Sequence, residues 1–463
     1  MAVVKLPHKA RPNKRFSVPG PVMPVNAKKR LRTIILQKQN FRLQHPETFD
    51  NFFWFVAERH RIHCLRIAGR NPPWTEDEIL AEYAFTNVFR VFDRVTQYIL
   101  CNVVGKGDEG LDDAVFRVLL FRTFNRIETW ELLEAELGTL TWREFDVDKY
   151  EEILVEAADQ GPLYGSVYII PAPDLGWGRN YANHLRLIKL MMDQGLPGKL
   201  QKFEYLRDAH GYLCLYPGVG NFTGFQYLLD LNMLPYYNWD EHLWAALGPG
   251  SKSGIQKMFG PSVRGQEDAA LEFLHDSLPS HFARLGIVAD NIPRLCDGRP
   301  PGLSMVDLEH SLCEYDKYCR ARFPLAKGGA RTHLRNKFNP NPNKPTAELP
   351  AKWTSVQKAL TLSKPPAVKL KNGEPYYEVS HIVAEKERCN ATARRYLVRW
   401  MGWGPEDDVW MSENDLVDAP SLLRNWNKLK EGIEKGVAEL RAKVPKPLTN
   451  LARRRRDSSS RAI

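Results

Sequence analysis

The stretch LYPGVGNFTGFQYLLDL, residues 215–231, places a proline and two glycines between two segments whose apolar spacing is typical of helices. Gly218 and Gly220 fit three structures: a phosphate cradle, a plain turn between helices, or a backbone bent tightly enough to contact DNA. In each case glycine permits positive φ and the close approach of a partner. We therefore predict a turn that leaves N–H groups free at the start of the second helix.

Two nucleotide-binding motifs invite comparison with this stretch and its neighbours. A P-loop needs Gly-x-x-x-x-Gly-Lys-[Ser/Thr], and neither GLPGKLQ (195–201) nor GPGSKSGI (248–255) satisfies that pattern. A dinucleotide-binding fingerprint needs a strand before its glycines, whereas KFEYLRDAHGYLCL (202–215) has a helical pattern. The sequence therefore favours neither kind of nucleotide site.

The organisation of the chain follows from the segments around the hairpin. With 463 residues, 43% of them apolar, the chain has room for more than one folded unit. A run rich in proline, lysine and asparagine has too few apolar residues to bury a core, and we predict a linker there. The predicted units are a basic disordered tail (1–45), a helical domain (46–324), the basic linker (325–375), a small α+β domain (376–432) and a second basic tail (433–463).

Positive charge is concentrated in three segments. The segments are 1–45, 325–375 and 441–463, and their net charges sum to +26. Because the whole chain has a net charge of +10, the other residues together have a net charge of −16. Basic segments attract phosphate regardless of sequence and can act as nuclear-import signals, although a solvated surface is the alternative. There is no apolar run long enough for a membrane span, no signal-peptide core and no Cys-x-x-Cys pair. We expect a nuclear protein with no membrane partner, no bound metal and no cofactor.

A short repeat lies within the predicted helical domain. VFRVFDRVTQ (88–97) and LFRTFNRIET (120–129) share Phe, Arg, Phe and Arg at the same offsets, which predicts a repeated helix. Four polar residues of the first copy fall on one side of that helix. They are Asn87, Arg90, Arg94 and Gln97. This stripe either meets phosphates or forms ordinary salt-bridged surface.

The C-terminal unit carries several motifs within about fifty residues. Tyr-x-Val-x-x-Ile begins at Tyr377, the strand YLVRWMGW covers 396–403, an acidic turn precedes Trp410, and a helix follows Pro420. On these residues the unit resembles a chromodomain. The resemblance implies a three-stranded sheet packed on a C-terminal helix.

The chromodomain resemblance also implies a binding site. In chromodomains that read methyl-lysine, three aromatic rings surround the ammonium group, and the matching residues are Tyr377, Trp400 and Trp403. A quaternary ammonium has no N–H to desolvate, so each well-placed ring contributes roughly 1–2 kcal/mol. A methylated histone H3-type tail would add as a strand to an exposed sheet edge. Met411 and Asp415 depart from the usual pattern, and ordinary packing of the aromatic residues is the alternative.

The hairpin stretch resembles the helix-hairpin-helix of base-excision DNA glycosylases, whose usual form is Leu-Pro-Gly-Val-Gly-x-x-Thr-Ala. The resemblance implies that Gly218, Gly220 and Thr223 hold a DNA phosphate on backbone N–H groups. In that superfamily a catalytic Asp lies about twenty residues beyond the second glycine, which here is Asp240. Such an Asp stabilises a cationic sugar or orients a water, whereas the alternative is a helix cap. No lysine follows the hairpin directly, which disfavours a Schiff-base lyase.

Further motifs resemble a narrower family, the helical domain of 5-hydroxymethyluridine DNA kinases and of α-glutamyl/putrescinyl-thymine pyrophosphorylases. The resemblance covers 46–324 and implies a glycosylase-like fold that handles modified thymine or uracil in DNA. Gly248, Gly250 and Ser251, with Lys252 as a counter-charge, then form a candidate anion nest, although an ordinary turn is the alternative. The motifs are FFWFVAERHRI, PPWTEDEIL, FTNVFRVFDRVTQ, LGPGSKSGI and DLEHSLCEYDKYCR, and they include Arg59, Arg90, Arg94, Glu314 and Lys317, to which we assign no role.

For the whole chain we expect a mainly α domain containing a helix-hairpin-helix, followed by a small α+β chromodomain. The expected function is chromatin-associated DNA binding and processing of hydroxymethyluracil- or thymine-type bases by a transferase or glycosylase-like enzyme. The alternative is a non-catalytic chromatin reader or a domesticated mobile-element protein. Because residues 46–324 carry a net charge of −13, DNA affinity would come from a local basic groove or from the tails.

Overall fold

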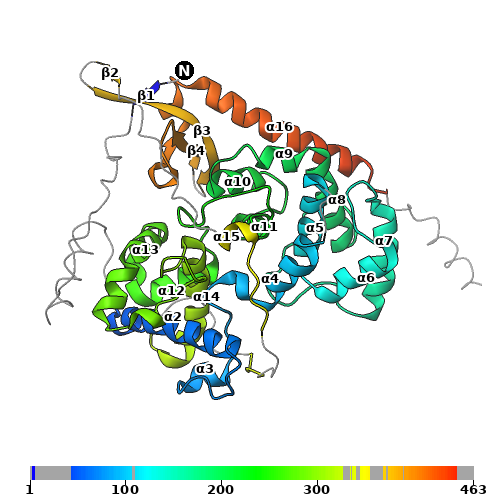
Figure 1. Ribbon diagram of the computed structural model, residues 1–463. Coiled ribbons are helices and arrows are strands. Elements are labelled where there is room, and N and C mark those ends of the chain that lie inside the picture. Colours follow the sequence, from blue (N-terminus) through cyan, green and yellow to red (C-terminus); the bar gives the residue numbers. More distant parts are fainter. Residues whose placement is uncertain are drawn as a thin grey trace, which may run out of the picture.

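The computed structural model describes residues 3–5, 43–106, 110–326, 334, 336–339, 345–354, 369–371, 374–388 and 391–445 (Figure 1). The α-helices are α2 (Pro46–Ile67), α3 (Glu78–Glu82), α4 (Arg94–Ile99), α5 (Leu111–Phe124), α6 (Ile127–Leu137), α7 (Val147–Gln160), α8 (Asn180–Asp193), α9 (Leu196–Leu200), α10 (Leu206–Leu213), α11 (Asn221–Leu231), α12 (Pro249–Phe259), α13 (Glu267–Arg284), α14 (Met305–Arg322), α15 (Ala351–Thr354) and α16 (Pro420–Ala442). The strands are β1 (Val3–Lys5), β2 (Lys369–Lys371), β3 (Glu374–Arg388), β4 (Ala391–Trp400) and β5 (Val409–Ser412). Short helical turns are η1 (Arg90–Phe92), η2 (Leu100–Val104), η3 (Pro261–Val263), η4 (Ala289–Asn291), η5 (Pro405–Asp407) and η6 (Glu413–Leu416).

The helical domain consists of two lobes that share a continuous hydrophobic core (Figure 1). The first lobe contains α2, α3 and α12 to α14, and the second contains α4 to α9. The pair α10 and α11 lies between them, with α11 against α5. Local sequence sets several helix ends: the side chains of Asp146 and Ser304 cap α7 and α14, and Gly138 ends α6 with positive φ. The prediction of a mainly helical domain is confirmed.

The predicted repeated helix is wrong. In the first copy, residues 90–92 form the turn η1 and a new helix begins only at Arg94. The second copy crosses the end of α5, where Asn125 adopts a left-handed conformation with φ 47°. Arg90 and Gln97 are buried and hydrogen-bonded inside the domain, so the polar stripe is not a surface stripe. Tertiary hydrogen bonds override the helical periodicity here.

Part of the expected linker lies on the helical domain. Residues 345–354, which we call the strap, pack Leu349 and Trp353 against the core and end in α15. The side chain of Gln97 exchanges two hydrogen bonds with the backbone of Glu348, at 2.9 and 2.8 Å. The expectation that residues 325–375 bury nothing is therefore wrong for the strap, because two apolar side chains and paired amides are enough to hold it.

The C-terminal unit is an antiparallel sheet of β3, β4 and β5 followed by α16, as the sequence predicts. The sheet packs on the start of α16 around a core that includes Ile382, Val398 and Trp426. Two further short strands pair antiparallel with the start of β3. β2 pairs with residues 374–376 of β3, and β1, near the N-terminus, pairs with residues 376–378.

The C-terminal unit is docked on the helical domain through buried charges. Arg399 of β4 lies 2.9 Å from Asp208 of α10 and binds Asp408 with two further hydrogen bonds, at 2.5 and 3.0 Å. Arg399, Asp208 and Asp408 are almost fully buried. Gly211 of α10 lies so close to β3 that a Cβ would stand 1.8 Å from the carbonyl oxygen of Val383. We call this set of contacts the docking interface.

The long helix α16 crosses from the sheet to the second lobe (Figure 1). Ile433 is buried in the core of the helical domain, and Gly436 packs against α8. The predicted tail at 433–463 is therefore wrong for residues 433–442, which continue this helix. The remaining tail residues from 446 lie outside the described part of the chain, as do residues 6–42 of the N-terminal tail.

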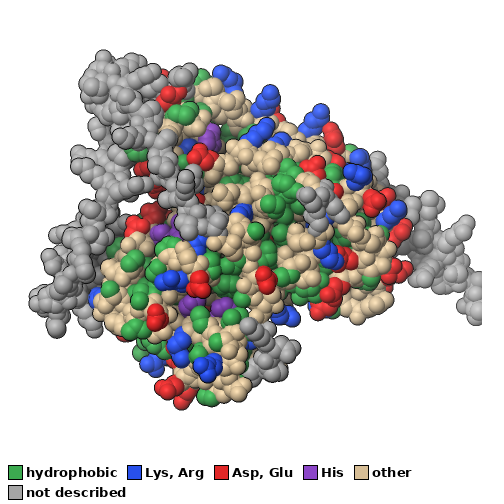
Figure 2. Space-filling view, in the orientation of Figure 1, with side chains coloured by type: hydrophobic (Ala, Val, Ile, Leu, Met, Phe, Trp, Pro, Cys, Tyr) green, Lys and Arg blue, Asp and Glu red, His purple; other side chains and the backbone are tan. Residues whose placement is uncertain are grey.

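The described surface mixes both signs of charge. Figure 2 shows lysine and arginine side chains interspersed with aspartate and glutamate over one face of the molecule. This mixture agrees with the net negative charge of residues 46–324. Within the described ranges, we find no helix that combines the length and apolar character needed to cross a membrane.

Candidate functional site

The turn between α10 and α11 contains the two glycines of the hairpin stretch. Gly218 has φ +74°, and a Cβ there would lie 2.9 Å from Cα of Pro173, so glycine is required. Gly220 has φ −90° with open space around it and caps α11. Positive φ thus applies to Gly218 and not to Gly220. Both glycines are exposed, whereas Thr223 is buried in the first turn of α11.

The start of α12 already binds a carboxylate. The N–H of Gly248 and the hydroxyl of Ser251 donate to Oε1 of Glu309 at 3.0 and 2.7 Å. Gly250 packs closely against α14, and Lys252 is exposed. Burial raises the pKa of Glu309. An external anion at these donors would have to displace this carboxylate.

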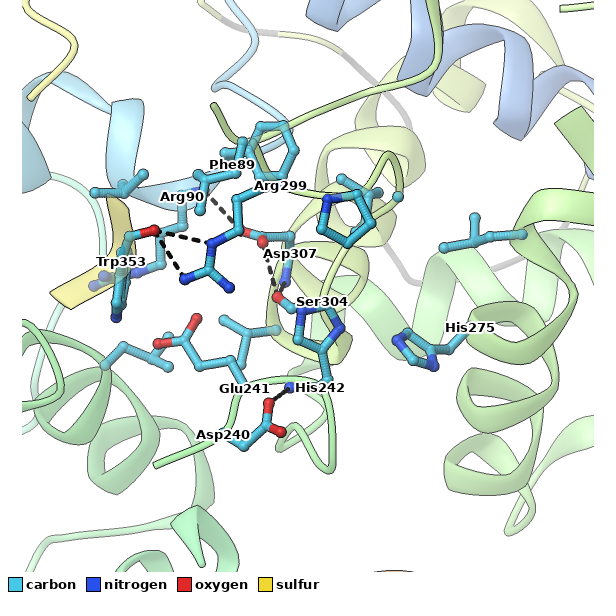
Figure 3. Close-up of a pocket in the computed structure, with 18 of the residues that line it drawn as sticks. Phe89, Arg90, Asp240, Glu241, His242, His275, Arg299, Ser304, Asp307 and Trp353 are labelled. Atoms are coloured by element: carbon cyan, nitrogen blue, oxygen red, sulfur yellow. Dashed lines mark hydrogen bonds between the residues drawn. The ribbon is translucent and has the colours of Figure 1, made fainter. Parts of the chain in front are cut away.

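Asp240 lines a cavity of about 250 Å³ between the end of α11, the start of α14 and the strap (Figure 3). Its Oδ1 accepts a hydrogen bond from the backbone N–H of His242 at 2.8 Å. This bond stabilises a turn and not a helix, because no helix follows. His275, Arg299 and Ser304 contribute further polar groups to the wall, beside apolar residues such as Leu229 and Met233.

Glu241 also lines the cavity, and its carboxylate points into it (Figure 3). Oε1 accepts a hydrogen bond from the side chain of Asn232 at 2.8 Å. Burial, together with the neighbouring carboxylate of Asp307, raises the pKa of Glu241 to about 7. A carboxyl group with such a pKa can donate or accept a proton near neutral pH. The sequence analysis missed Glu241, for which adjacency to Asp240 was the available signal.

The strap forms one side of the cavity. The carbonyl oxygen of Trp353 accepts two hydrogen bonds from the guanidinium of Arg299, at 2.9 and 2.8 Å (Figure 3). Nζ of Lys352 donates to the carbonyl oxygen of Leu234 at 2.8 Å, and burial lowers the pKa of Lys352 to about 8. The strap is therefore part of the wall of the candidate site.

Of the motif residues without an assigned role, all but Arg94 lie in or beside a second polar cluster between the lobes. Asp230 of α11 is fully buried and accepts hydrogen bonds from Arg90, at 2.9 Å, and from Arg122. Arg90 and Arg122 occupy the same position in the two copies of the sequence repeat, and both bind this one carboxylate. Arg90 also lines the cavity of Asp240, so the cluster and the cavity share a wall.

Acidic groups surround the other side of this cluster. Nε2 of His310 lies 3.3 Å from Asp93 and 2.9 Å from the hydroxyl of Thr86, whose N–H donates to Glu314. Burial alone would lower the pKa of His310, but Asp93 and Glu314 outweigh it and the pKa is raised. Glu314 also pairs with Lys317. The imidazole is therefore held as part of a charged network.

Several buried atoms of the cluster have no hydrogen-bond partner. They are Nη1 of Arg59, Oδ1 of Asn87 and Nε of Arg90. Buried polar atoms in native proteins are nearly always hydrogen-bonded to protein or to ordered water, so these atoms are positions at which water or a ligand group could bind. Arg94, in contrast, is exposed. In the described part of the chain, no group of three or more His, Cys, Asp or Glu residues could hold a metal ion.

The aromatic residues of the C-terminal unit are placed unequally. Trp400 is buried, with 3% of its surface exposed, inside the core of the sheet. Trp403 is half-buried, and its backbone N–H donates a hydrogen bond to the backbone carbonyl oxygen of Trp400. The side chain of Tyr377 lies outside the described part of the structure, but its backbone pairs with Val4 of β1. The edge at which a peptide would add is thus paired with the chain's own N-terminus.

Comparison with known proteins identifies both units. The model of the family described as "5-hmdU DNA kinase, helical domain" matches residues 46–328, more than half of the chain. The chain belongs to this family. The Chromo (CHRromatin Organisation MOdifier) domain model matches residues 377–429, so the C-terminal unit is a chromodomain joined to the 5-hmdU DNA kinase helical domain.

Two curated relatives match one unit each. A 5-hmdU DNA kinase of Bacillus phage SP10 is 28% identical over 247 residues, which cover 48% of this chain and 38% of the relative. Chromo domain-containing protein 1 of Schizosaccharomyces pombe is 35% identical over 63 residues, which cover 14% of this chain and 6% of the relative. The chain therefore spans well under half the length of either relative. No solved structure matches.

Proposed function

We propose that this protein processes a modified uracil- or thymine-type base in DNA while its chromodomain holds it on chromatin in the nucleus. Two findings support the substrate class: membership of the helical-domain family, and a relative named for 5-hydroxymethyldeoxyuridine in DNA. The chromodomain supports the location. No P-loop motif accompanies the helical domain in this sequence, so we propose base processing other than phosphorylation.

The observation that carries the proposal is the cavity with two adjacent carboxyl groups. Asp240 presents a carboxylate that would stabilise positive charge on a sugar or orient an attacking nucleophile. Glu241, with its pKa near 7, would move the proton that accompanies this step. At about 250 Å³, the cavity is slightly below the roughly 300–1,000 Å³ typical of small-molecule sites, a size suited to one flipped base.

DNA would be held at the hairpin. The exposed turn at Gly218 and Gly220 leaves the first N–H groups of α11, through that of Thr223, facing a phosphate. The nest at Gly248 is a weaker candidate for an anion, because Glu309 occupies its donors. A pyrophosphate would bind there only after Glu309 had been protonated or moved.

The chromodomain would bind a methylated lysine in a histone H3-type tail, with Trp403 and Tyr377 completing a cage whose floor is Trp400. Because Trp400 is buried in the core of the sheet, its substitution would also destabilise the fold. Trp403→Ala therefore tests the cage more cleanly than Trp400→Ala does. Incoming peptide would take the edge of β3 that β1 now covers.

The decisive experiment uses the full chain and duplexes that carry thymine, 5-hydroxymethyluracil or pyrophosphorylated 5-hydroxymethyluracil. We expect an altered nucleoside by mass spectrometry with a modified base. Asp240→Asn should lower the rate at least about 100-fold, because the side chain keeps its size but loses its charge. Asp290→Asn, at an exposed position away from the cavity, is the matched control.

A second outcome separates the enzyme from the main alternative. If duplexes and methylated peptides bind but none of the bases is altered, the protein is a chromatin reader that uses the helical domain only for attachment. Full turnover by Asp240→Asn would leave base processing in place and remove Asp240 from it.

A further inference from the structure

A short loop beside the hairpin exposes two large apolar side chains. Val167 and Ile169 are 48% and 59% exposed, and they flank Tyr168. Single exposed apolar residues are common on protein surfaces and need no explanation. Two on one loop, on either side of an anchored aromatic residue, form a small apolar ridge. We call residues 165–169 the ridge loop.

The backbone of the ridge loop is fixed by α5. The N–H of Gly165 donates to the carbonyl oxygen of Phe124 at 2.9 Å, and the side chain of Asn125 donates to the carbonyl oxygen of Val167 at 2.7 Å. A Cβ at Gly165 would lie 2.2 Å from the carbonyl oxygen of Asn125, so the two segments are in close contact. The exposed side chains therefore stand on a rigid support.

Tyr168 anchors the loop from within. It has φ +51°, a strained conformation for an aromatic residue, which the surrounding contacts hold in place. Its ring lies nearly parallel to that of Phe222, with an interplanar angle of 9° and 6.4 Å between centroids. The guanidinium of Arg122 lies 5.8 Å from the same ring. The strain at Tyr168 is therefore stabilised by the polar cluster that adjoins the cavity.

The ridge loop and the hairpin belong to one surface. Phe222 lies in the first turn of α11, directly after the turn proposed to bind phosphate. Pro173, which follows the loop, is in close contact with Gly218 at the tip of the hairpin. Through Pro173 and Tyr168 the ridge loop contacts the hairpin, so a duplex bound at the hairpin would lie beside this loop.

We propose that the ridge loop is a wedge, and that Val167 and Ile169 enter the base stack of a duplex bound at the hairpin. This inference rests on the proposed function, since it supplies the step that takes a base out of the helix. Apolar side chains that enter the base stack separate neighbouring bases and kink the duplex. A loop that is already rigid avoids a further ordering cost on binding. Tyr168 supports the wedge without entering the stack.

The test uses a duplex with 2-aminopurine next to 5-hydroxymethyluracil, because the fluorescence of 2-aminopurine rises when it is unstacked. Wild-type protein should raise this signal. The double substitution Val167→Ser, Ile169→Ser should reduce the signal per bound duplex about tenfold, while affinity from fluorescence anisotropy stays within a few-fold. Both side chains are exposed, so the fold is expected to persist, and circular dichroism melting checks it.

A matched control is available elsewhere on the surface. Val155 and Val288 are also exposed, at 47% and 61%, and Val155→Ser, Val288→Ser should leave the signal unchanged. A full 2-aminopurine signal in the ridge-loop variant would overturn the wedge. So would a loss of affinity with an unchanged signal per bound duplex, because the loop would then be only a contact surface.

Failure of the wedge can be told apart from failure of the proposed function. If the ridge-loop variant keeps both its signal and its turnover of the modified base, the wedge is wrong and base processing stands. If wild-type protein neither binds the duplex nor alters its nucleosides, the proposed function is wrong, and the wedge falls with it.

Discussion

Glu241 and Asp240 are neighbours in the chain, yet their side chains lie in different electrostatic environments. Asp240 bonds to the backbone two residues ahead, whereas Glu241 faces the cavity near the carboxylate of Asp307. Burial and this neighbour both favour the protonated form of Glu241. Two carboxyl groups with separate tasks are a common arrangement in acid–base catalysis. The free energy of unfolding should therefore change with pH as Glu241 titrates.

We expect Glu241→Gln to flatten the pH dependence of the free energy of unfolding. Between the ordinary pKa near 4.5 and the folded-state pKa near 7, the folded protein holds a proton that the unfolded chain releases. The free energy of unfolding of the wild type therefore falls as pH rises through this window, by roughly 3 kcal/mol at most, and Glu241→Gln should not show this fall. Urea unfolding at pH 5, 6, 7 and 8 measures it. Glu156→Gln, at an exposed site, is the control, and parallel profiles for Glu241→Gln and wild type would contradict the assignment.

Asp240 can be predicted from the sequence, but the residues that surround it in the cavity cannot. The distance from Gly220 is a property of the chain, so a resemblance in that motif points to the residue. The pKa of Glu241 depends on Asp307 and on burial by the strap, which are far away in sequence. The same holds for Trp400, where the motif indicates an aromatic ring but not that it is 3% exposed.

At the scale of single elements, the two glycines of the hairpin have different structural roles. Gly218 supplies the backbone conformation and the close contact with Pro173, while Gly220 leaves the start of α11 open. The sequence predicts the turn but not this division, because both residues are glycine. The repeat at 88–97 fails for a related reason: the guanidinium of Arg90 bonds to Asp230, 140 residues away, and no local pattern reveals that partner.

We expect valine at these two positions to have opposite effects. Gly218→Val should destabilise the fold by roughly 1–3 kcal/mol, because φ +74° strains a β-branched residue and Cβ meets Pro173. Gly220→Val should change stability by no more than about 1 kcal/mol but weaken DNA binding, since its side chain would cover the phosphate-binding N–H groups. Thermal unfolding and fluorescence anisotropy measure the two effects. Gly220→Ala is the milder control, and normal affinity in Gly220→Val would move the phosphate site elsewhere.

At the scale of the whole molecule, the first residues of the chain pair with the sheet edge of the proposed peptide site. The N-terminal segment carries eleven lysines and arginines with no acidic residue, and its strand β1 covers the chromodomain edge. The sequence predicts the helical and chromodomain units as separate bodies. It does not predict the strap or the docking interface, since both depend on a few buried contacts between distant segments.

Deleting residues 1–42, which stops short of the buried Leu43, should change two affinities in opposite directions. DNA binding should weaken and depend less steeply on salt, because fewer counterions are released. Binding of a trimethyl-lysine H3-type peptide should strengthen, because β1 no longer competes for β3. Anisotropy at several salt concentrations and titration calorimetry give the two values. A deletion of residues 6–42 keeps β1 and should show only the DNA effect; an unchanged salt slope would place the DNA contact in the folded domain.

If the proposed function holds, the docking interface would fix the geometry between a bound histone tail and a bound duplex. Arg399 lies next to Trp400 in β4 and reaches Asp208 in α10, the helix that leads into the hairpin. A reader on a flexible tether would sample every base within reach of its linker, with an effective concentration set by linker length. Here buried contacts fix the chromodomain on the helical domain, so a bound methylated tail would set the distance to the base that is processed. Bases at one distance and one rotational phase from the tail's exit point would be processed, and those half a helical turn away would not.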